Sequence, residues 1–438
     1  MSADPASEAY QRQQALVDEL KADGSIQSPA VEAAFRAVAR HHFIPEVPLD
    51  EAYANQAIAT KRIDNLVVSS TSQPGMMAIM LEMLTLQPGH RVLEIGAGTG
   101  YNAALMAEIV GERGEVVAID IDEDIVEAAR AHLAATGYHR VRVLCGDGAL
   151  GAPDAAPFDR IVLTVAATDV SPAWREQLSP HGRLLLPLRV GGILTQKVVL
   201  FEAAGDHLES VDVRGGWFIM LRGTHGQEQR RVQLEAASGL ALWADTLPTI
   251  PPATLFDLVS GPARDSPTGV QVTRGEMWGG LLFWLGLHEP SLCQLVTGSA
   301  SLDARHRRWP LRYPSGDYLS TIGLVGTDGT AETDGSARAD LVGATGGVAV
   351  LAGPPVVPPE PLPADRPEPY EVVVQGYGDA EPLARRLIAL VRAWEAAGRP
   401  SGSGLRIRAY PAESPPDWAG PGEIVIQKPR TRLVVDWS

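Results

Sequence analysis

The amino-acid sequence predicts an α/β fold in which a doubly wound, mostly parallel sheet is followed by a C-terminal α+β extension. Three observations support this prediction. The run Arg91–Gly100 reads as a short buried strand with glycines at alternate positions after it. Strand-like and helix-like segments then alternate as far as about Leu188. The second strand ends in an acid, Asp120, as strands of nucleotide-binding folds often do.

The segment before the glycine-rich run is expected to be helical. Residues 9–40 read as two amphipathic helices separated by a turn at 21–24, and Ser28 and Pro29 predict the N-cap and first residue of the second helix. A further helix is expected after Pro74, with Ser72 as its N-cap.

The alternating region supplies the sheet. After the first strand, strands are expected at Val116–Asp120, Val141–Cys145, Phe158–Thr164 and Arg183–Leu188, with a helix at Ile125–Thr136. An antiparallel hairpin, Lys197–Phe201 with Leu208–Val213, is expected to close the sheet.

The pattern changes after residue 225, which predicts four parts. They are a nucleotide-binding domain at 1–225, a glycine-rich accessory region at 226–353, a proline-rich linker at 354–369 and a C-terminal β/α module at 370–438. An aromatic patch in the accessory region comprises Trp278, Phe283 and Trp284. The terminal module is expected to hold strands at Tyr370–Gln375, Leu405–Tyr410, Glu423–Ile426 and Leu433–Trp437, with a helix from Asp379.

Composition narrows the range of partners. The 438 residues carry 37 basic and 53 acidic side chains, a net charge of −16, which disfavours nonspecific binding to nucleic acid or to an anionic membrane. The two cysteines, Cys145 and Cys293, form neither a disulfide framework nor a metal-binding pattern. The polar N-terminus does not resemble a signal peptide, and the most apolar run, Leu281–Leu287, is too short to span a bilayer. We therefore expect a cytoplasmic protein without a metal.

The spacing of the glycine-rich run indicates the ligand. A dinucleotide loop reads GxGxxG, whereas here Glu94, Gly96, Gly98 and Gly100 form ExGxGxG. Glu94 would repel a phosphate but suits an amino-bearing, cationic ligand such as S-adenosylmethionine (AdoMet). A turn with no ligand is the alternative interpretation, because isolated glycine-rich loops are weak evidence.

Two further strand ends carry groups suited to a nucleoside. Asp120 can accept hydrogen bonds from both ribose hydroxyls, although neighbouring Asp122 could compete for that role. Asp147, between Gly146 and Gly148, can accept from an adenine amino group, the alternative being an ordinary Asx turn.

The hydroxyl-rich segment Ser69–Pro74 is the candidate acceptor site. Several hydroxyls at a helix N-terminus suit a carboxylate, because free N–H groups and the helix dipole both favour an anion there. The alternative is a plain helix cap. His41 and His42 lack any accompanying nucleophile or metal pattern, and the methionines at 76, 77, 80 and 83 are expected to pack in the core.

Several motifs in order resemble the protein-L-isoaspartate O-methyltransferase family. They are Val38–Pro45, Ala52-Tyr53, Ser72–Pro74, Val92–Ala104, Gly146–Gly148 and Ala156–Ile161. The resemblance covers roughly residues 30–220. It implies a Rossmann-like class I methyltransferase that moves a methyl group from AdoMet to a carboxylate and leaves S-adenosylhomocysteine.

The resemblance also implies site residues. Substrate-carboxylate hydroxyls would be those of Ser70 and Ser72. The cofactor would be bound by Glu94, Gly96, Ala97, Gly98, Gly100, Asp120, Ile121, Gly146, Asp147, Gly148 and Thr164.

Two departures from the family pattern suggest a specialised substrate. A longer segment, Ile58–Val68, stands where the repair enzymes have a short Leu-Pro-Ile-Gly-x-Gly stretch, and some 200 residues follow the expected sheet. Long-tailed relatives occur in actinobacterial pathways that mature ribosomally made peptides such as lanthipeptides and graspetides. Such an enzyme esterifies an aspartate of a constrained peptide, and the ester closes to an aspartimide that can open to isoaspartate.

Three hypotheses follow. The first is methylation of an aspartate in a modified precursor peptide, with the tail reading the substrate. The second is repair of isoaspartyl residues in damaged proteins. The third is an AdoMet-binding interaction protein without turnover, against which Ser70, Ser72 and Glu94 argue.

Overall fold

The computed structural model describes residues 5–63, 66–226, 230–236, 239–298, 311–312, 318–327, 346–352, 369–402, 404–414, 420 and 422–437. The chain forms two compact units. The first comprises Met1–Val190, Gln196–Gln227 and Leu405–Ser438, and the second comprises Gly191–Thr195 and Glu228–Gly404. Each is described by itself below. Among the described helices, none is long and apolar enough to cross a membrane.

The N-terminal segment is helical, as expected. Helices α1 (Pro5–Ala22) and α2 (Pro29–Ala37) lead into a 3-10 turn, η1 (Arg40–Phe43), and the short helix α3 (Leu49–Ala52). The predicted cap is confirmed, since the Ser28 side chain accepts a hydrogen bond from the Val31 N–H. His41 lies 2.7 Å from the Tyr53 hydroxyl, outside the site described below.

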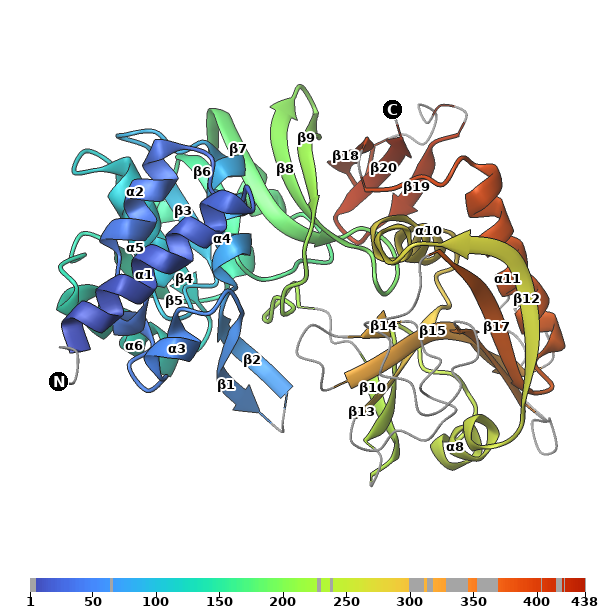
Figure 1. Cartoon of the computed structure of the whole chain (residues 1–438). Helices are drawn as coiled ribbons and strands as arrows, with labels where there is room; N and C mark the ends of the chain where they lie inside the picture. Colours follow the sequence, from blue (N-terminus) through green and yellow to red (C-terminus); the bar gives the residue numbers. More distant parts are fainter. Residues whose placement is uncertain are drawn as a thin grey trace. The chain divides into compact units, whose positions relative to one another are not determined.

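A parallel sheet forms the centre of the first unit, as the sequence predicts (Figure 1). Its strands are β3 (Arg91–Ile95), β4 (Glu115–Asp120), β5 (Arg142–Cys145), β6 (Phe158–Leu163) and β7 (Leu178–Arg189), in the spatial order β5-β4-β3-β6-β7. Connecting segments contain α5 (Tyr101–Val110), α6 (Glu123–Ala135), η2 (Gly148–Leu150), η3 (Pro153–Ala155) and α7 (Pro172–Glu176). The carboxyl ends of the parallel strands meet at one edge, where ligands bind in such folds.

The sheet continues as antiparallel strands. The predicted hairpin is confirmed as β8 (Gln196–Ala204) and β9 (His207–Gly215). Beyond β9 come strands from the end of the chain, β18 (Leu405–Pro411), β20 (Thr431–Trp437) and β19 (Ile424–Gln427). Strand β18 pairs with β9 through Arg408 opposite Glu209 and Ala409 opposite Leu208.

This pairing differs from the predicted module at 370–438. The end of the chain joins the first unit, whereas β17 (Tyr370–Gly378) and α11 (Glu381–Ala396) belong to the second. The physical reason is that β9 would otherwise leave an unpaired edge, which β18 covers. Local patterning in the sequence contains no signal for that long-range pairing.

The second unit contains an antiparallel sheet. Its described strands run in the order β10 (Arg230–Glu235), β11 (Leu240–Ala244), β13 (Cys293–Gly298), β15 (Tyr318–Thr327), β16 (Gly346–Ala352), β17 and β12 (Ala263–Val272), and β14 (Leu311–Arg312) pairs with β15. Its helices are α8 (Pro252–Ser260), α9 (Arg274–Glu276), the π-helical η4 (Met277–Leu281), α10 (Leu282–His288) and α11. In the aromatic patch, Phe283 is buried, while Trp278 and Trp284 pack against the core beside Trp394. Of the predicted linker at 354–369, only Pro369 lies within the described residues.

A separate hairpin precedes the central sheet. Strands β1 (Ile58–Ile63) and β2 (Leu66–Thr71) pair with each other and lead into α4 (Pro74–Leu84). The predicted N-cap Ser72 is wrong. Gln73 occupies the cap position without a side-chain hydrogen bond, because the helix begins one residue too late for the Ser72 hydroxyl to serve. On α4, Met77, Met80 and Met83 are buried in the core.

Candidate functional site

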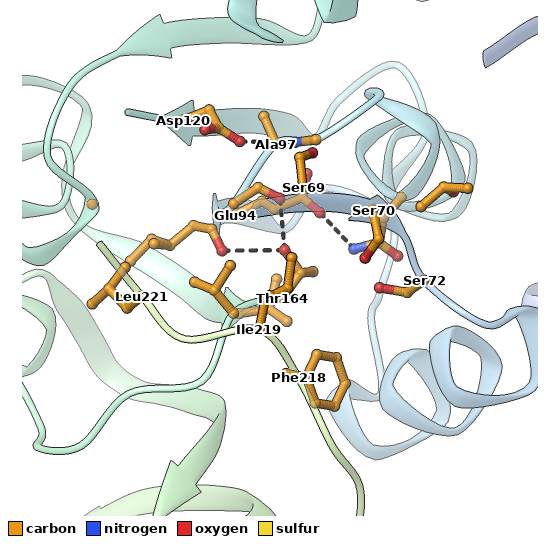
Figure 2. A pocket seen from close by; sticks show the side chains of 18 of the residues that line it. Ser69, Ser70, Ser72, Glu94, Ala97, Asp120, Thr164, Phe218, Ile219 and Leu221 are labelled. Atoms are coloured by element: carbon orange, nitrogen blue, oxygen red, sulfur yellow. Dashed lines mark hydrogen bonds between the residues drawn. The ribbon is translucent and has the colours of Figure 1, made fainter. Parts of the chain in front are cut away.

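A pocket lies at the carboxyl edge of the parallel strands in the first unit (Figure 2). It is lined by four groups of residues, which are Val68–Ser72 from the end of the hairpin, Glu94–Asn102 except Gly100, Ile119–Ile121 from the end of β4, and Phe218–Arg222. Gly148, Thr164 and the α4 residues Met77 and Met80 also contribute. The strand ends thus deliver polar groups to one cavity, as the sequence predicts.

Glycines allow the backbone to form this cavity. Gly96 has a φ of +98°, and a Cβ there would lie 2.6 Å from the Thr164 hydroxyl oxygen. That hydroxyl donates a hydrogen bond of 2.6 Å to the Gly96 carbonyl. At Gly148 a Cβ would lie 2.4 Å from Cγ2 of Ile95. Any larger residue at either position would disrupt the wall of the pocket.

Glu94 is the most unusual group in the pocket. Its side chain is fully buried, and Oε1 accepts a hydrogen bond of 2.7 Å from the Asn102 amide. Its Oε2 is buried without a hydrogen-bond partner in the described part of the chain. Burial raises the pKa of Glu94 to about 8, although the Asn102 hydrogen bond opposes the shift. A cationic donor suits this unpaired oxygen best, because it would stabilise the ionised form of the carboxyl that burial disfavours.

Asp120 lies at the end of β4 and is bonded to the glycine-rich loop. Its Oδ2 accepts from the Gly98 N–H at 3.0 Å, and its Oδ1 accepts from the Ile121 N–H at 2.9 Å. Burial raises its pKa, and these backbone hydrogen bonds oppose the rise. Each carboxylate oxygen can accept more than one hydrogen bond, so Asp120 retains capacity for ligand hydroxyls.

Asp147 occupies a different environment from the one expected. Its Oδ1 accepts from the Ala149 N–H at 2.9 Å, and its Oδ2 accepts from both the N–H and the hydroxyl of Thr224 at 2.7 Å. The carboxylate therefore caps η2 and binds the segment that follows Arg222. Asp147 does not line the pocket, whereas Gly148 next to it does.

The hydroxyl-rich segment reaches the pocket at Ser70 and Ser72. Figure 2 shows both side chains in the same view as Glu94 and Thr164, with Ile219 drawn beside Thr164 and Phe218 set apart below them. Ser69 is buried and its hydroxyl accepts from Thr60 at 3.0 Å. The buried guanidinium of Arg40 donates to the Ser72 carbonyl at 3.2 Å, which fixes the backbone at the end of the segment.

Most of the predicted site residues therefore share one cavity. Those that line it are Ser70, Ser72, Glu94, Gly96, Ala97, Gly98, Asp120, Ile121, Gly148 and Thr164. Gly100, Gly146 and Asp147 do not line it. Gly100 instead precedes α5 with a φ of +86°, where a Cβ would lie 3.2 Å from the Leu133 side chain.

Sequence reasoning missed two parts of the site. Asn102, the partner of Glu94, lies on the first turn of α5, and its place just after the loop was the available signal. The segment Phe218–Arg222 carries no motif from which its position could be inferred, yet it lines the pocket. No group of three or more His, Cys, Asp and Glu suited to a metal ion is present among the residues with described positions.

Comparisons with known proteins decide the family. The model of the Protein-L-isoaspartate(D-aspartate) O-methyltransferase family matches residues 11–225. The Protein-L-isoaspartate O-methyltransferase of Methanopyrus kandleri is 42% identical over 192 residues, which span 44% of this chain and 82% of the relative. Protein-L-isoaspartate O-methyltransferase 2 of Archaeoglobus fulgidus is 36% identical over 216 residues, spanning 49% of this chain and 95% of the relative. The chain belongs to the protein-L-isoaspartate O-methyltransferase family.

Membership makes this chain an AdoMet-dependent protein carboxyl methyltransferase, with the family activity in residues 11–225. A solved structure named protein-L-isoaspartate O-methyltransferase is 24% identical with a TM-score of 0.48, covering 90% of this chain and 96% of that one. The described strands β10–β17 and helix α11 lie outside residues 11–225, the range that the family model matches.

The residues of the pocket fit AdoMet. The unpaired Oε2 of buried Glu94 suits the ammonium group of the methionine part. Asp120 supplies a carboxylate at the strand end where a ribose is held in such folds. A Cβ at Gly98 would have only the Ser70 carbonyl oxygen within 4 Å, at 3.6 Å, so the loop leaves space beside the hairpin.

Proposed function

We propose that this methyltransferase esterifies an aspartate side chain in a ribosomally made, post-translationally modified peptide. The backbone nitrogen of the next residue would then attack the ester and release methanol to form an aspartimide, which adds water and opens to aspartate or isoaspartate. The observation that carries the proposal is the second folded unit, because the curated relatives named above align with less than half of this chain. We propose that this unit recognises the precursor peptide, and we place the reaction in the cytoplasm, where such peptides are made.

The hairpin β1–β2 supports a substrate that differs from an ordinary isoaspartyl peptide. Its strands occupy Ile58–Ile63 and Leu66–Thr71, and the second strand leads to the pocket-lining residues Ser70 and Ser72. Ile63 and Leu66 in this hairpin are 47% and 44% exposed, which offers apolar surface to a peptide. An altered segment beside the acceptor hydroxyls is expected to change which carboxylate fits.

The side chains of the pocket have distinct proposed roles. Ser70 and Ser72 donate hydrogen bonds to the acceptor carboxylate. Glu94 accepts from the ammonium group of AdoMet, and Asp120 accepts from its ribose hydroxyls. Gly96, Ala97, Gly98, Ile121, Gly148 and Thr164 shape the remaining cofactor wall. Gly100 ends the glycine-rich loop outside the pocket wall, and Gly146 and Asp147 position Gly148. Asp147 is also the candidate acceptor for the adenine amino group.

This arrangement accounts for a reaction without a general base. AdoMet supplies an electrophilic methyl group attached to a positively charged sulfur. A carboxylate is already ionised at neutral pH, so Ser70 and Ser72 need only orient it. Alignment of two reactants contributes on the order of 7–11 kcal/mol. The apolar residues Phe218, Ile219 and Leu221 exclude water from part of the cavity, which favours the meeting of opposite charges.

Isoaspartyl repair is the second candidate function. It is favoured by the match over 82% and 95% of the lengths of the two relatives named above, both called protein-L-isoaspartate O-methyltransferases. The two functions share the cofactor, the acceptor hydroxyls and the bond formed. They differ in whether the carboxylate belongs to an aspartate of a constrained peptide or to an isoaspartate of a damaged protein.

Mass spectrometry of two substrates tests the proposal. A macrocyclic peptide containing aspartate and a linear isoaspartyl peptide are incubated in parallel with the full-length enzyme and AdoMet. The proposal predicts the gain of one methyl group, followed by loss of methanol, on macrocyclic aspartyl peptides. The assay is repeated with a panel of macrocyclic aspartyl peptides. Methylation of the isoaspartyl peptide, with none of these macrocycles methylated, would establish repair instead.

A further inference from the structure

Asp122 is held between two basic side chains, Arg222 from the pocket-lining segment Phe218–Arg222 and Lys61 from strand β1 of the hairpin. Arg222 donates to both carboxylate oxygens, with 3.1 Å between Nη1 and Oδ1 and 2.8 Å between Nη2 and Oδ2. The Lys61 ammonium lies 2.9 Å from Asp122 Oδ2 and 2.7 Å from Asp124 Oδ1. The hydrogen bonds from Arg222, and then that from Lys61, lower the pKa of Asp122 to about 2 despite partial burial, so this carboxylate is ionised at any working pH.

Each partner of Asp122 is connected to a part of the pocket wall. Lys61 is on β1 and pairs with Ser69 of β2, the strand that continues to Ser70. Arg222 ends the wall segment Phe218–Arg222. Asp122 itself follows Ile121, which lines the pocket at the end of β4. One carboxylate therefore joins the acceptor-side wall and the Phe218–Arg222 wall to the cofactor-side strand.

The geometry points to a clamp, formed by Lys61, Asp122 and Arg222, that holds these two walls closed on the pocket and slows the release of the bound nucleoside. We propose that all three are positioning residues for AdoMet and for its product, S-adenosylhomocysteine. The inference concerns the cofactor and does not depend on which carboxylate is methylated. It also separates Asp122 from ribose recognition, since Asp122 does not line the pocket, whereas Asp120 does.

Several features distinguish the clamp from an isolated surface ion pair, which contributes little. Asp122 is only 17% exposed at its side chain, and Lys61 is 26% exposed. The guanidinium contact is bidentate, which fixes geometry as well as charge. Asp124, by contrast, is 67% exposed and pairs with Lys61 but not with Arg222, so it provides a matched control two residues away from Asp122.

The direct test is the dissociation rate of radiolabelled S-adenosylhomocysteine from the full-length protein, measured by chase with unlabelled ligand. Asp122→Asn is expected to release it roughly tenfold faster, equivalent to about 1.4 kcal/mol. Lys61→Met and Arg222→Met should each accelerate release. The variant that carries both substitutions should release the ligand at about the same rate as Asp122→Asn. Asp124→Asn should release the ligand at nearly the wild-type rate. High salt should accelerate release from the wild type more than from Asp122→Asn.

Hydrogen exchange supplies a readout that a general loss of stability would not reproduce. With S-adenosylhomocysteine bound, amides in 66–71 and 218–222 should exchange faster in Asp122→Asn, while those in β3 keep their protection. If Asp122→Asn fails to fold, Lys61→Met on the hairpin provides the same comparison. Dissociation and exchange unchanged in these variants, or changed equally in Asp124→Asn, would overturn the proposal.

Discussion

The Asn102 amide donates a 2.7 Å hydrogen bond to Oε1 of Glu94, which leaves the second oxygen of this buried, pocket-lining carboxyl without a partner in the described structure. Asn102 thereby fixes the orientation of the Glu94 side chain but provides a hydrogen bond to only one of its two oxygens. The ammonium group of AdoMet would donate a hydrogen bond to the remaining oxygen. Two predictions depend on this relationship.

Glu94→Gln is expected to weaken AdoMet binding about ten- to hundredfold, because a hydrogen bond to a charged group contributes roughly 1.5–3 kcal/mol. The substitution preserves shape and removes the charge. Isothermal titration calorimetry measures the affinity, with Asp124→Asn as a control for the loss of one acidic charge at the surface. Equal affinities of Glu94→Gln and the wild type would exclude a role for this carboxylate in binding the ligand.

The stability of the ligand-free protein should depend on pH through Glu94. Its pKa in the folded protein is about 8, against an ordinary value of 4.5, so between these values the folded state holds a proton that the unfolded chain has lost. The free energy of unfolding therefore falls as pH rises across this range. Urea unfolding should show Glu94→Gln gaining stability over the wild type at pH 8 compared with pH 5. A difference that is the same at both pH values would contradict this.

Ser72→Ala should lower turnover with little change in AdoMet affinity. Because Gln73 and not Ser72 occupies the cap position of α4, the variant should also keep the thermal midpoint of the wild type. Steady-state kinetics with an acceptor peptide, together with calorimetry of AdoMet, separate these effects. Ser25→Ala, at a half-buried position outside the pocket, serves as a control for hydroxyl loss. Full turnover in Ser72→Ala would remove this hydroxyl from the acceptor site.

Asp169 should anchor the end of the chain to the first unit. Its carboxylate is 3% exposed and accepts from the Arg430 N–H at 2.8 Å and from the Thr431 hydroxyl. Asp169→Asn is expected to reduce the free energy of unfolding by about 2 kcal/mol. The reason is that a neutral amide replaces the buried carboxylate as the acceptor of these hydrogen bonds, which weakens them. Chemical denaturation measures this. An unchanged denaturation midpoint would show that the strands β18–β20 are held without Asp169.

The predicted parts of the fold are those with local causes. The turn after β3 follows from glycine spacing, and the Ser28 cap follows from residues three positions apart. The parallel strands could be predicted because apolar runs alternate with helical periodicity. Glu94 and Asp120 could be predicted to share a cavity because parallel strands end at one edge.

The parts that could not be predicted join distant segments. Arg406 and Glu209 are 197 positions apart and lie 2.8 Å from each other, as β18 adds to β9. Arg222 and Asp122 are 100 positions apart. Periodicity and motif spacing describe only neighbours along the chain, so neither the terminal strands nor the clamp leaves a local signal. The Ser72 cap was predicted wrongly because its residue type suits a cap, while the start of the helix is set by Pro74.

Transfer of a labelled methyl group tests the central claim most directly. Full-length protein is incubated with methyl-labelled AdoMet and with the isoaspartyl and macrocyclic aspartyl peptides, and the peptide product is then treated with mild alkali. A carboxyl methyltransferase predicts label on at least one of the peptides, released by alkali as methanol, with greatly reduced incorporation in Glu94→Gln at low AdoMet concentration. Label that stays on the peptide in alkali would show transfer to nitrogen or sulfur and would contradict the assignment of the Ser70–Ser72 segment as a carboxylate site.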